Sequence, residues 1–437
     1  MKMTPQSLAS RRSFLVKTGV LAGSLLVLMA STAYGQSKPL DGVTLTLASQ
    51  NDQFGAVLAK LAPKFKEETG ADLKVEIMNY GELLSKTTAD FVADTGAYDL
   101  VTMDIVWAGA YAENGYSVDL TDWVARDAAE LELDDIYPVL LESLGQYEGR
   151  YVAFPFASYA NLMVYRKDLF EAAGLAPPTT TEQMVAAAKA LTDPTKNQYG
   201  FVANGAAGAP GAQDWMLYNS QFGGSIMGAD GKVALNSPEN VNSLAVYKEL
   251  FLESAPPGAI DYDWGARGES FRQGITAMLE TWSVGIPQIL DPAQSTVADK
   301  VGIILAPVAE GLPADYGVGG WAMAINADIP AEKQEAAWTF IKWLTSKPIH
   351  KEFNLEGAGS FMRKSQMTDP DLLAAFPDLL PLIATTYENG NGEFRPRIPQ
   401  YPEIQDYLGT AVNTVLAGGL EPQEALDEAQ ARALELF

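Results

Sequence analysis

Between residues 43 and 103, β-rich runs alternate with helical patterns, and this alternation constrains the fold more than any other feature of the sequence. The strand-like runs are residues 43–48, 73–77 and 98–103. The helical patterns between them cover residues 57–70 and 82–94. Strands and helices in this order predict parallel βαβ units and an α/β fold.

Polar residues follow each of the three predicted strands. These segments are residues 50–52, 80–82 and 104–107. In parallel sheets, ligands bind beyond the carboxyl ends of the strands, and these ends meet at one edge of the sheet. The sequence therefore predicts a ligand site at this edge.

The rest of the chain also mixes strands and helices, without a tandem repeat or a low-complexity linker. Further strands are predicted at residues 151–156, 162–165 and 322–325, and a β-hairpin at residues 227–235. Helices are predicted at residues 167–173, 181–191 and 331–344 and, in two segments, at 404–437. The length of 437 residues predicts two domains or one large one, and the missing linker favours interwoven domains.

Residues 1–35 are predicted to be an export signal. Arg11 and Arg12 precede an apolar core at residues 20–30, an order typical of the twin-arginine route, although paired arginines also leave a Sec signal open. The core is shorter than the roughly 20 residues that a membrane-spanning helix needs, and small residues after it predict cleavage near Gln36. We therefore expect a periplasmic protein, with an uncleaved membrane anchor as the alternative.

Composition excludes several classes of partner. The chain has no cysteine, which excludes a lipoprotein whose lipid is attached to that residue. The formal net charge is −25, so the surface repels phosphate backbones and anionic lipid headgroups. Nucleic acids and membrane surfaces are therefore poor partners.

The sequence offers little for catalysis. His350 is the only histidine, so neither a histidine-pair metal site nor a Ser-His-Asp triad can be built without it. It follows a proline among lysines, and we interpret it as the solvated start of a helix. Carboxylates such as Glu82, Asp104 and Glu280 leave a glycosidase open, because such enzymes need only two of them.

Four of the eight tryptophans lie at predicted strand ends or in loops. They are Trp107, Trp215, Trp282 and Trp321. A flat indole can stack on the C–H face of a sugar while carboxylates and amides bind its hydroxyls, a combination typical of ligand pockets. For each residue alone, core packing is an equally good explanation.

Five segments, in the same order along the chain, resemble family 1 of the bacterial extracellular solute-binding proteins, which are the sugar receptors of ABC importers. The segments are residues 98–121, 151–180, 271–278, 319–322 and 337–341. The third segment reads F-x-x-G-x-x-A-M, and residues 399–405 read P-x-Y-x-E-I-Q as in the subgroup that binds sugar alcohols and monosaccharides. The glycine-rich stretch at 205–211 and Met362 depart from the family pattern, which puts the size of the ligand in question.

The resemblance implies a two-lobed periplasmic binding protein fold of type II. Each lobe is then a mixed sheet flanked by helices, and crossover strands near residues 156–160 and 318–322 join the lobes, with a third crossing after the helix at 331–344. The resemblance places residues 36–157 with 319–350 in the N-terminal lobe and residues 158–318 with 351–437 in the C-terminal lobe. The ligand lies between the lobes, and a hinge closes them over it.

Both lobes and their crossings are expected to supply ligand contacts. The candidates in the first lobe and the first crossing are Asn51, Glu82, Asp104, Trp107, Tyr159 and Asn161. Those in the second lobe and the return crossing are Arg267, Glu280, Trp282, Gly320, Trp321 and Arg395. Carboxylates give directional, charge-assisted hydrogen bonds to hydroxyls, and glycine lets backbone N–H groups approach a ligand.

The resemblance also implies the partners. They are a small carbohydrate or polyol and the membrane subunits of an ABC permease, with no nucleic acid, no cofactor and no metal, and the protein is expected to be a monomer and not an enzyme. Two alternatives stay open: a receptor for another solute, such as an oligosaccharide or a polyamine, and a periplasmic enzyme that cleaves carbohydrate.

Overall fold

The computed structural model describes residues 38–437. The predicted export signal at residues 1–35 and the cleavage site near Gln36 lie outside the described residues. Among residues 38–437, no helix combines the length and the apolar character that crossing a membrane requires.

The described residues form ten strands and eighteen α-helices, joined by short 3-10 and π-helical turns. The strands are β1 (Thr44–Gln50), β2 (Asp72–Met78), β3 (Leu100–Asp104), β4 (Gln146–Tyr147), β5 (Arg150–Tyr151), β6 (Phe154–Arg166), β7 (Met278–Trp282), β8 (Val301–Leu305), β9 (Tyr316–Ile325) and β10 (Gly390–Asn391).

Helices account for most of the remaining chain. Those of the first half are α1 (Gln53–Thr69), α2 (Tyr80–Val92), α3 (Ala108–Asn114), α4 (Thr121–Arg126), α5 (Ala128–Leu131), α6 (Pro138–Leu140), α7 (Lys167–Ala173), α8 (Thr181–Ala190) and α9 (Ala209–Gln221). Those of the second half are α10 (Pro238–Ser254), α11 (Trp264–Arg272), α12 (Ile286–Leu290), α13 (Ala331–Thr345), α14 (Lys347–Phe353), α15 (Pro370–Ala375), α16 (Leu380–Glu388), α17 (Tyr401–Leu416) and α18 (Pro422–Leu434).

The predicted βαβ units are confirmed. β1 pairs in parallel with β2 on one side and with β3 on the other, and α1 and α2 connect these strands. The residue directly before each of α1 and α2 caps that helix: Asp52 accepts a hydrogen bond from the Gln53 N–H, and Asn79 accepts one from the Glu82 N–H. The helix predicted from residue 82 therefore begins two residues earlier, at Tyr80.

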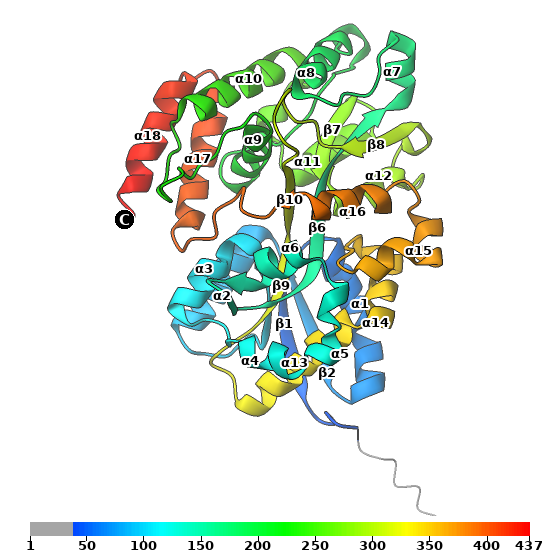
Figure 1. Ribbon diagram of the computed structural model, residues 1–437, viewed down its shortest axis with the longest axis vertical. Helices are drawn as coiled ribbons and strands as arrows, with labels where there is room; N and C mark the ends of the chain where they lie inside the picture. The colour runs from blue at the N-terminus through cyan, green and yellow to red at the C-terminus, as the bar shows by residue number, and fades with distance from the viewer. Residues whose placement is uncertain (1–37) are drawn as a thin grey trace, which may run out of the picture. The chain divides into compact units, whose positions relative to one another are not determined.

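Two long antiparallel strands, β6 and β9, connect the two halves of the sheet (Figure 1). β6 pairs with β9 from Phe154 to Ala160, and its remaining residues pair with β7 and β8. β9 pairs with β3 on its other side. The first two predicted crossings, near residues 156–160 and 318–322, therefore fall where these strands pair with each other.

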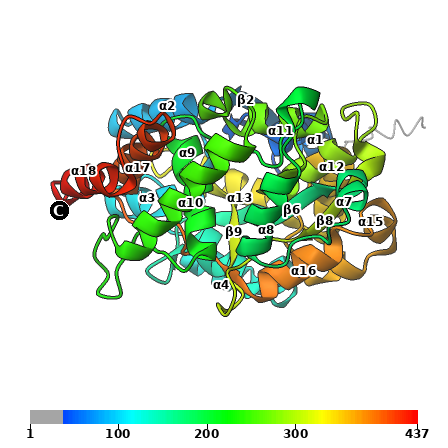
Figure 2. The ribbon, with the colours of Figure 1, turned by 90° about the horizontal axis from the view of Figure 1, so that it is seen from above.

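Helices surround each half of this sheet. In Figure 1, α1, α2 and α13 lie around β1, β2 and β3, whereas α7 to α11 lie around β7 and β8. Figure 2 shows α17 beside α18 on the flank next to α9, in agreement with the contacts between these helices. The two predicted C-terminal helices are thus confirmed, with Gly418 in the left-handed region between them. The predicted hairpin is reduced to a single bridge between Met227 and Val233.

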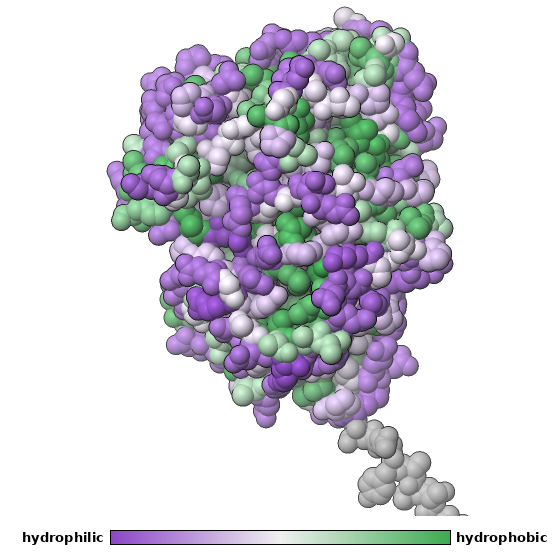
Figure 3. Space-filling view, in the orientation of Figure 1, coloured by the Kyte–Doolittle hydropathy of each residue, from purple (hydrophilic) through white to green (hydrophobic). Residues whose placement is uncertain are grey.

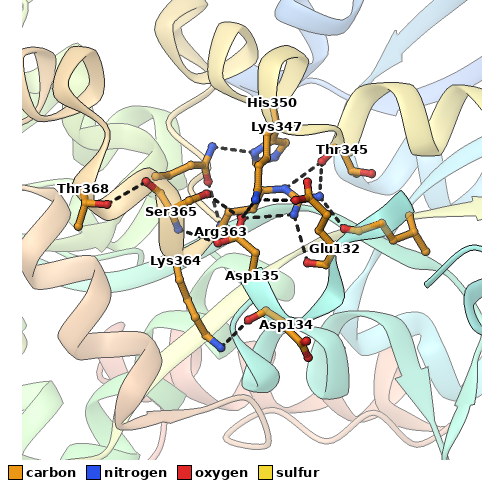
Figure 4. Close-up of polar contacts among 12 residues, drawn as sticks. Glu132, Asp134, Asp135, Thr345, Lys347, His350, Arg363, Lys364, Ser365 and Thr368 are labelled. Carbon is orange, nitrogen blue, oxygen red and sulfur yellow. Dashed lines mark hydrogen bonds and ion pairs between the residues drawn. The ribbon is translucent and has the colours of Figure 1, made fainter. Parts of the chain in front are cut away.

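The interpretation of His350 as a solvated residue is wrong, because its side chain is fully buried (Figure 4). The Gln366 amide donates to Nδ1 (3.0 Å), so Nε2 carries the proton and donates to the Phe156 carbonyl of β6 (3.0 Å). Beside it, the buried Arg363 guanidinium donates to the Thr345 and Leu131 carbonyls. Both side chains therefore hold the segment after α13 against the rest of the first half of the sheet.

The surface agrees with the acidic composition. Figure 3 shows a face on which hydrophilic residues dominate and hydrophobic residues gather in a few patches. Several of the lysines are already paired with acids, including Lys60 with Glu356 and Lys64 with Glu352. These two pairs attach the segment that contains Glu352 and Glu356 to α1.

Candidate ligand-binding site

A cavity of about 910 Å³ opens at the carboxyl ends of β1, β2 and β3. On one side it is lined by residues from 50–53, 79–81 and 104, which we call the first wall. On the other side it is lined by residues from 209–213, 263–272 and 281–289, which we call the second wall. Ala56, Tyr159, Gly320, Trp321 and Arg395 complete the lining. The site predicted from the polar strand ends is therefore present as a cavity.

Asp52 joins the first wall to the crossing strand. One carboxylate oxygen accepts from the Gln53 N–H (2.8 Å), and the other accepts from the Tyr159 hydroxyl (2.8 Å). Burial raises the pKa of Asp52, although both hydrogen bonds oppose that shift. The carboxylate is thus a preorganised acceptor on the cavity surface.

Asp104, at the last position of β3, is the centre of a second polar group. It accepts from the Tyr80 hydroxyl at 2.9 Å and lies 3.5 Å from a guanidinium nitrogen of Arg395. Burial lowers the pKa of Arg395, but Asp104 and two neighbouring tyrosines raise it by more, so the guanidinium stays charged. Its Nε has no partner among residues 38–437. Arg395 also lines the cavity, where a ligand can meet its side chain.

Aromatic rings form the base of the cavity beside these charges. The Trp321 indole packs against Phe54 at 5.7 Å and against Tyr80 at 6.0 Å between ring centroids. Gly320 precedes it with a φ of +143°, and a Cβ at this position would lie 2.1 Å from the Ala157 carbonyl oxygen of β6. Glycine is therefore required here because β6 and β9 approach each other closely, rather than because of a ligand.

The second wall presents indoles in front of a buried ion pair. Trp264, at the start of α11, and Trp282, at the end of β7, both line the cavity. Arg267 also lines it, but its guanidinium is paired with the fully buried Asp214 of α9. Burial raises the pKa of Asp214, and Arg267 opposes the shift.

This arrangement suits an uncharged, polyhydroxylated ligand. Asp52 and Asp104 can accept from hydroxyl groups, Arg395 can donate to hydroxyl oxygens, and the indoles offer flat apolar faces to C–H groups. Because each of these charges already has a neighbour of opposite charge or a hydrogen-bond donor, a neutral ligand leaves no buried charge without compensation.

Eight of the twelve residues predicted from the sequence line the cavity. They are Asn51, Asp104, Tyr159, Arg267, Trp282, Gly320, Trp321 and Arg395.

Glu82 and Trp107 lie outside the lining. Glu82 is two residues beyond Tyr80 on α2, where its side chain is exposed and pairs with Lys86. Trp107 follows Asp104 in a 3-10 turn that carries its indole behind the first wall, against Tyr80 at 5.2 Å and Trp321 at 5.6 Å. Trp107 therefore supports the cavity's aromatic residues from behind.

Asn161 and Glu280 also lie outside the lining, behind the second wall. Each is two residues along its strand from a lining residue, Tyr159 and Trp282 respectively, and therefore on the same face but deeper in the lobe. Gln221 donates to Glu280, and burial raises the pKa of Glu280 to about 8. Both residues are thus buried behind the cavity lining.

Several lining residues were missed, among them Asp52, Asn79, Tyr80, Gln213 and Trp264. Asp52 and Asn79 carried a usable signal, because each is a helix-capping residue directly after a predicted strand. Tyr80 opens the second polar segment. Gln213 and Trp264 lie at the starts of α9 and α11, which the strand pattern does not reveal.

Comparison with known proteins identifies the family. The profile described as "Bacterial extracellular solute-binding protein" matches residues 48–351. A curated relative, a probable amino-acid ABC transporter periplasmic-binding protein of Sinorhizobium fredii, is 25% identical over 391 residues, which are 88% of this chain and 87% of the relative.

Solved structures give closer matches. An ABC transporter solute-binding protein of Agrobacterium radiobacter K84, crystallised in complex with ribitol, is 74% identical with a TM-score of 0.89. The match covers 92% of this chain and all of that protein. A solute-binding protein of Agrobacterium vitis S4 with bound D-mannitol is 28% identical with a TM-score of 0.80, covering 90% of this chain and 97% of its own.

Proposed function

Because the chain belongs to the family of bacterial extracellular solute-binding proteins, we propose that it captures a sugar alcohol or a monosaccharide in the cavity and delivers it to an ABC permease. The observation that carries the proposal is the set of Asp52, Asp104 and Arg395 beside indole faces in one cavity. The relatives with bound ribitol and D-mannitol support the same class of ligand.

We propose that the two walls close over the ligand by a hinge. β6 and β9 are the connections that would bend, because β9 pairs with β3 in the first half, β6 pairs with β7 and β8 in the second, and the two strands pair with each other. A ligand that touches both walls binds the closed form better, so binding shifts the population toward that form. The permease would then recognise the closed form.

The lobe boundaries at residues 157/158, 318/319 and 350/351 stay a prediction. The ion pairs of Glu352 and Glu356 with α1 favour assigning residues up to about 356 to the first lobe. Small-angle scattering with and without ligand tests the hinge, because closure should lower the radius of gyration.

The family places the working protein outside the cytoplasm, in the periplasm. We propose the twin-arginine route for its export, on the basis of Arg11 and Arg12. Replacing both arginines with lysine should abolish export through this route and leave the protein in the cytoplasm, whereas unchanged export would indicate the Sec route.

We propose further that the protein binds its ligand without cleaving it. Asp52 and Asp104 each accept a hydrogen bond from a tyrosine hydroxyl, an arrangement that holds a carboxylate as an acceptor. Recovery of the intact ligand after long incubation, measured by NMR, tests this point. A cleaved disaccharide would favour the enzyme alternative.

A thermal-shift screen followed by calorimetry tests the function itself. The ligands should include ribitol, other pentitols, mannitol, monosaccharides, disaccharides, polyamines and amino acids. A ligand at 100 times its Kd adds about 2.7 kcal/mol of stability, which such a screen detects easily. Stabilisation by one polyol or monosaccharide is the expected result. Stabilisation by amino acids or polyamines alone would overturn the assignment.

A further inference from the structure

Gln213 connects the two indoles of the second wall. It is the fifth residue of α9, it lines the cavity, and its side chain is largely buried. Its amide oxygen accepts from the Trp264 indole N–H at 2.5 Å and from the Trp282 indole N–H at 3.4 Å. A single oxygen atom thus holds two tryptophans that come from α11 and β7.

These two hydrogen bonds determine which way the amide faces. An indole nitrogen is a donor and cannot accept, so the Gln213 oxygen must point toward Trp264 and Trp282. The amide nitrogen Nε2 then occupies the other position, because the two hydrogen bonds that the side chain makes within residues 38–437 both go to its oxygen. It is therefore a fixed donor at the cavity surface.

We propose that Gln213 determines specificity in this cleft: it positions both indoles through its oxygen and donates from Nε2 to a hydroxyl oxygen of the ligand. The proposal rests on the proposed function, because it assigns a further contact to the same ligand. It also narrows the ligand class to molecules that carry a hydroxyl or ether oxygen beside a C–H face long enough to lie along the indoles.

The position of Trp264 extends this role to both walls. Its ring lies 6.1 Å from the ring of Tyr80, which belongs to α2 in the first wall, and the Tyr80 hydroxyl donates to Asp104. The Trp264 indole, which Gln213 holds in place, therefore contacts Tyr80, and Tyr80 orients the carboxylate of Asp104 in the first wall. Loss of the Gln213 oxygen would loosen this contact as well.

Two substitutions separate the two halves of the role. Gln213→Glu keeps an oxygen for both indoles but removes the donor that faces the ligand. Gln213→Ala removes the oxygen and the donor together. The matched control is Gln183→Glu on the exposed surface of α8, where the glutamine oxygen likewise accepts two hydrogen bonds, both from Thr179.

Calorimetry with the polyol or sugar found in the screen measures the effects, and tryptophan emission reports on the indoles. Gln213→Glu should raise the Kd about tenfold, the usual effect of one lost hydrogen bond, while the emission of the free protein stays close to that of the wild type. Gln213→Ala should raise the Kd further and shift the emission. Gln183→Glu should leave both unchanged.

The proposal is overturned if Gln213→Ala binds the ligand within twofold of the wild type, because the Gln213 amide then makes no contact that matters. It is also overturned if Gln213→Ala leaves the emission unchanged, because the indoles then do not depend on the oxygen. Failure of the wild-type protein to bind any polyol or sugar would instead overturn the proposed function. Should Gln213→Ala fail to fold, Gln213→Met, which removes the oxygen and the donor but keeps the length of the side chain, gives the same comparison.

Discussion

The two walls of the cavity are built in opposite ways. The first wall exposes charged groups, Asp52 and Asp104, and apolar aromatic rings such as Trp107 and Phe54 lie behind it. The second wall exposes two indoles beside Asp263, Arg267 and Arg272, and further charged and polar groups lie behind it. These are Asn161, Asp214, Gln221 and Glu280, all buried. The first wall thus supplies carboxylate acceptors, whereas the second wall supplies indoles, which the Gln213 amide oxygen holds in place. The two walls should therefore respond differently to pH and to substitution.

The largest expected effect concerns Glu280, behind the second wall. Burial raises its pKa from the ordinary value of 4.5 to about 8 in the folded protein. As the pH rises, Glu280 therefore loses its proton in the unfolded chain before it does so in the folded one. The stability that the protonated Glu280 carboxyl contributes is therefore complete below pH 4.5 and is lost as the pH rises to 8. The unfolding free energy falls by up to about 5 kcal/mol over this range, at 1.36 kcal/mol per pKa unit. Glu280→Gln removes this loss, so its unfolding free energy should match the wild type at low pH and exceed it at pH 8.

Urea denaturation of both proteins between pH 4.5 and 8.5 measures this difference, and other carboxylates cancel because both proteins share them. Parallel curves over the whole range would mean that Glu280 ionises normally. In that case the polar layer behind the second wall would not be shielded from water, and the contrast between the walls would fail.

The second effect concerns His350, which lies under the crossing strand that both walls share. Burial lowers its pKa to about 4, below the ordinary value of 6.5, and the neutral ring donates to the Phe156 carbonyl. As the pH falls from 6.5 to 4, the unfolded chain gains a proton that the folded chain does not. About 3 kcal/mol of stability should therefore be lost on acidification, in the opposite direction to the effect of Glu280.

His350→Gln, which keeps a donor but cannot titrate in this range, should abolish the acid-induced part of the loss. The control compares the wild type with His350→Gln at pH 7. The histidine and the glutamine at position 350 are both uncharged at this pH, so the two proteins should differ only through packing. A loss between pH 6.5 and 4 that is the same in both proteins would assign acid sensitivity to other groups.

The third effect tests the first wall by removing one charge. Asp104→Asn keeps an oxygen for the Tyr80 hydroxyl but leaves Arg395 without its carboxylate, and breaking a buried charge pair at a binding site typically costs 2–5 kcal/mol. We expect ligand affinity to fall about 100-fold, measured by calorimetry. Asp214→Asn breaks the corresponding pair behind the second wall and should mainly lower stability.

Equal losses of affinity in Asp104→Asn and Asp214→Asn would contradict this difference, because the pair behind the second wall would then matter for the ligand as much as the pair in the first wall. Asp119→Asn, a change of the same charge at an exposed position, should affect neither property.

These contrasts also explain how far the sequence could predict the site. The parallel strands and the polar strand ends followed from local periodicity, because one lobe begins with a regular βαβ pattern. The crossings near residues 156–160 and 318–322 followed only from the resemblance to the family. Glu280 and Asn161 were assigned to the ligand, but each lies two residues further along its strand than a lining residue. A period of two residues does not reveal how far along a strand the cavity ends.

The second wall was harder to predict for a related reason. Gln213 and Trp264 reach the cavity because α9 and α11 begin beside it, and the placement of a helix start depends on packing between segments that lie far apart in the sequence. His350 looked exposed because its neighbours in sequence are lysines, yet it faces the core on its own helix turn. The residues next to His350 in the sequence therefore led to a wrong prediction, because tertiary packing determines whether a side chain is buried.

The smallest expected effect concerns Trp107 and sharpens the distinction between a lining residue and a supporting one. Because its indole is buried behind Tyr80 and Trp321, Trp107→Phe should lower the unfolding free energy by about 1–2 kcal/mol and weaken ligand binding only a few-fold. Trp321→Ala removes a lining indole and should weaken binding much more. Trp338→Phe, in the core beside α4, should lower Tm without changing the Kd. A loss of affinity in Trp107→Phe as large as in Trp321→Ala would mean that Trp107 contacts the ligand, and the first wall would then expose both its charges and its aromatic layer.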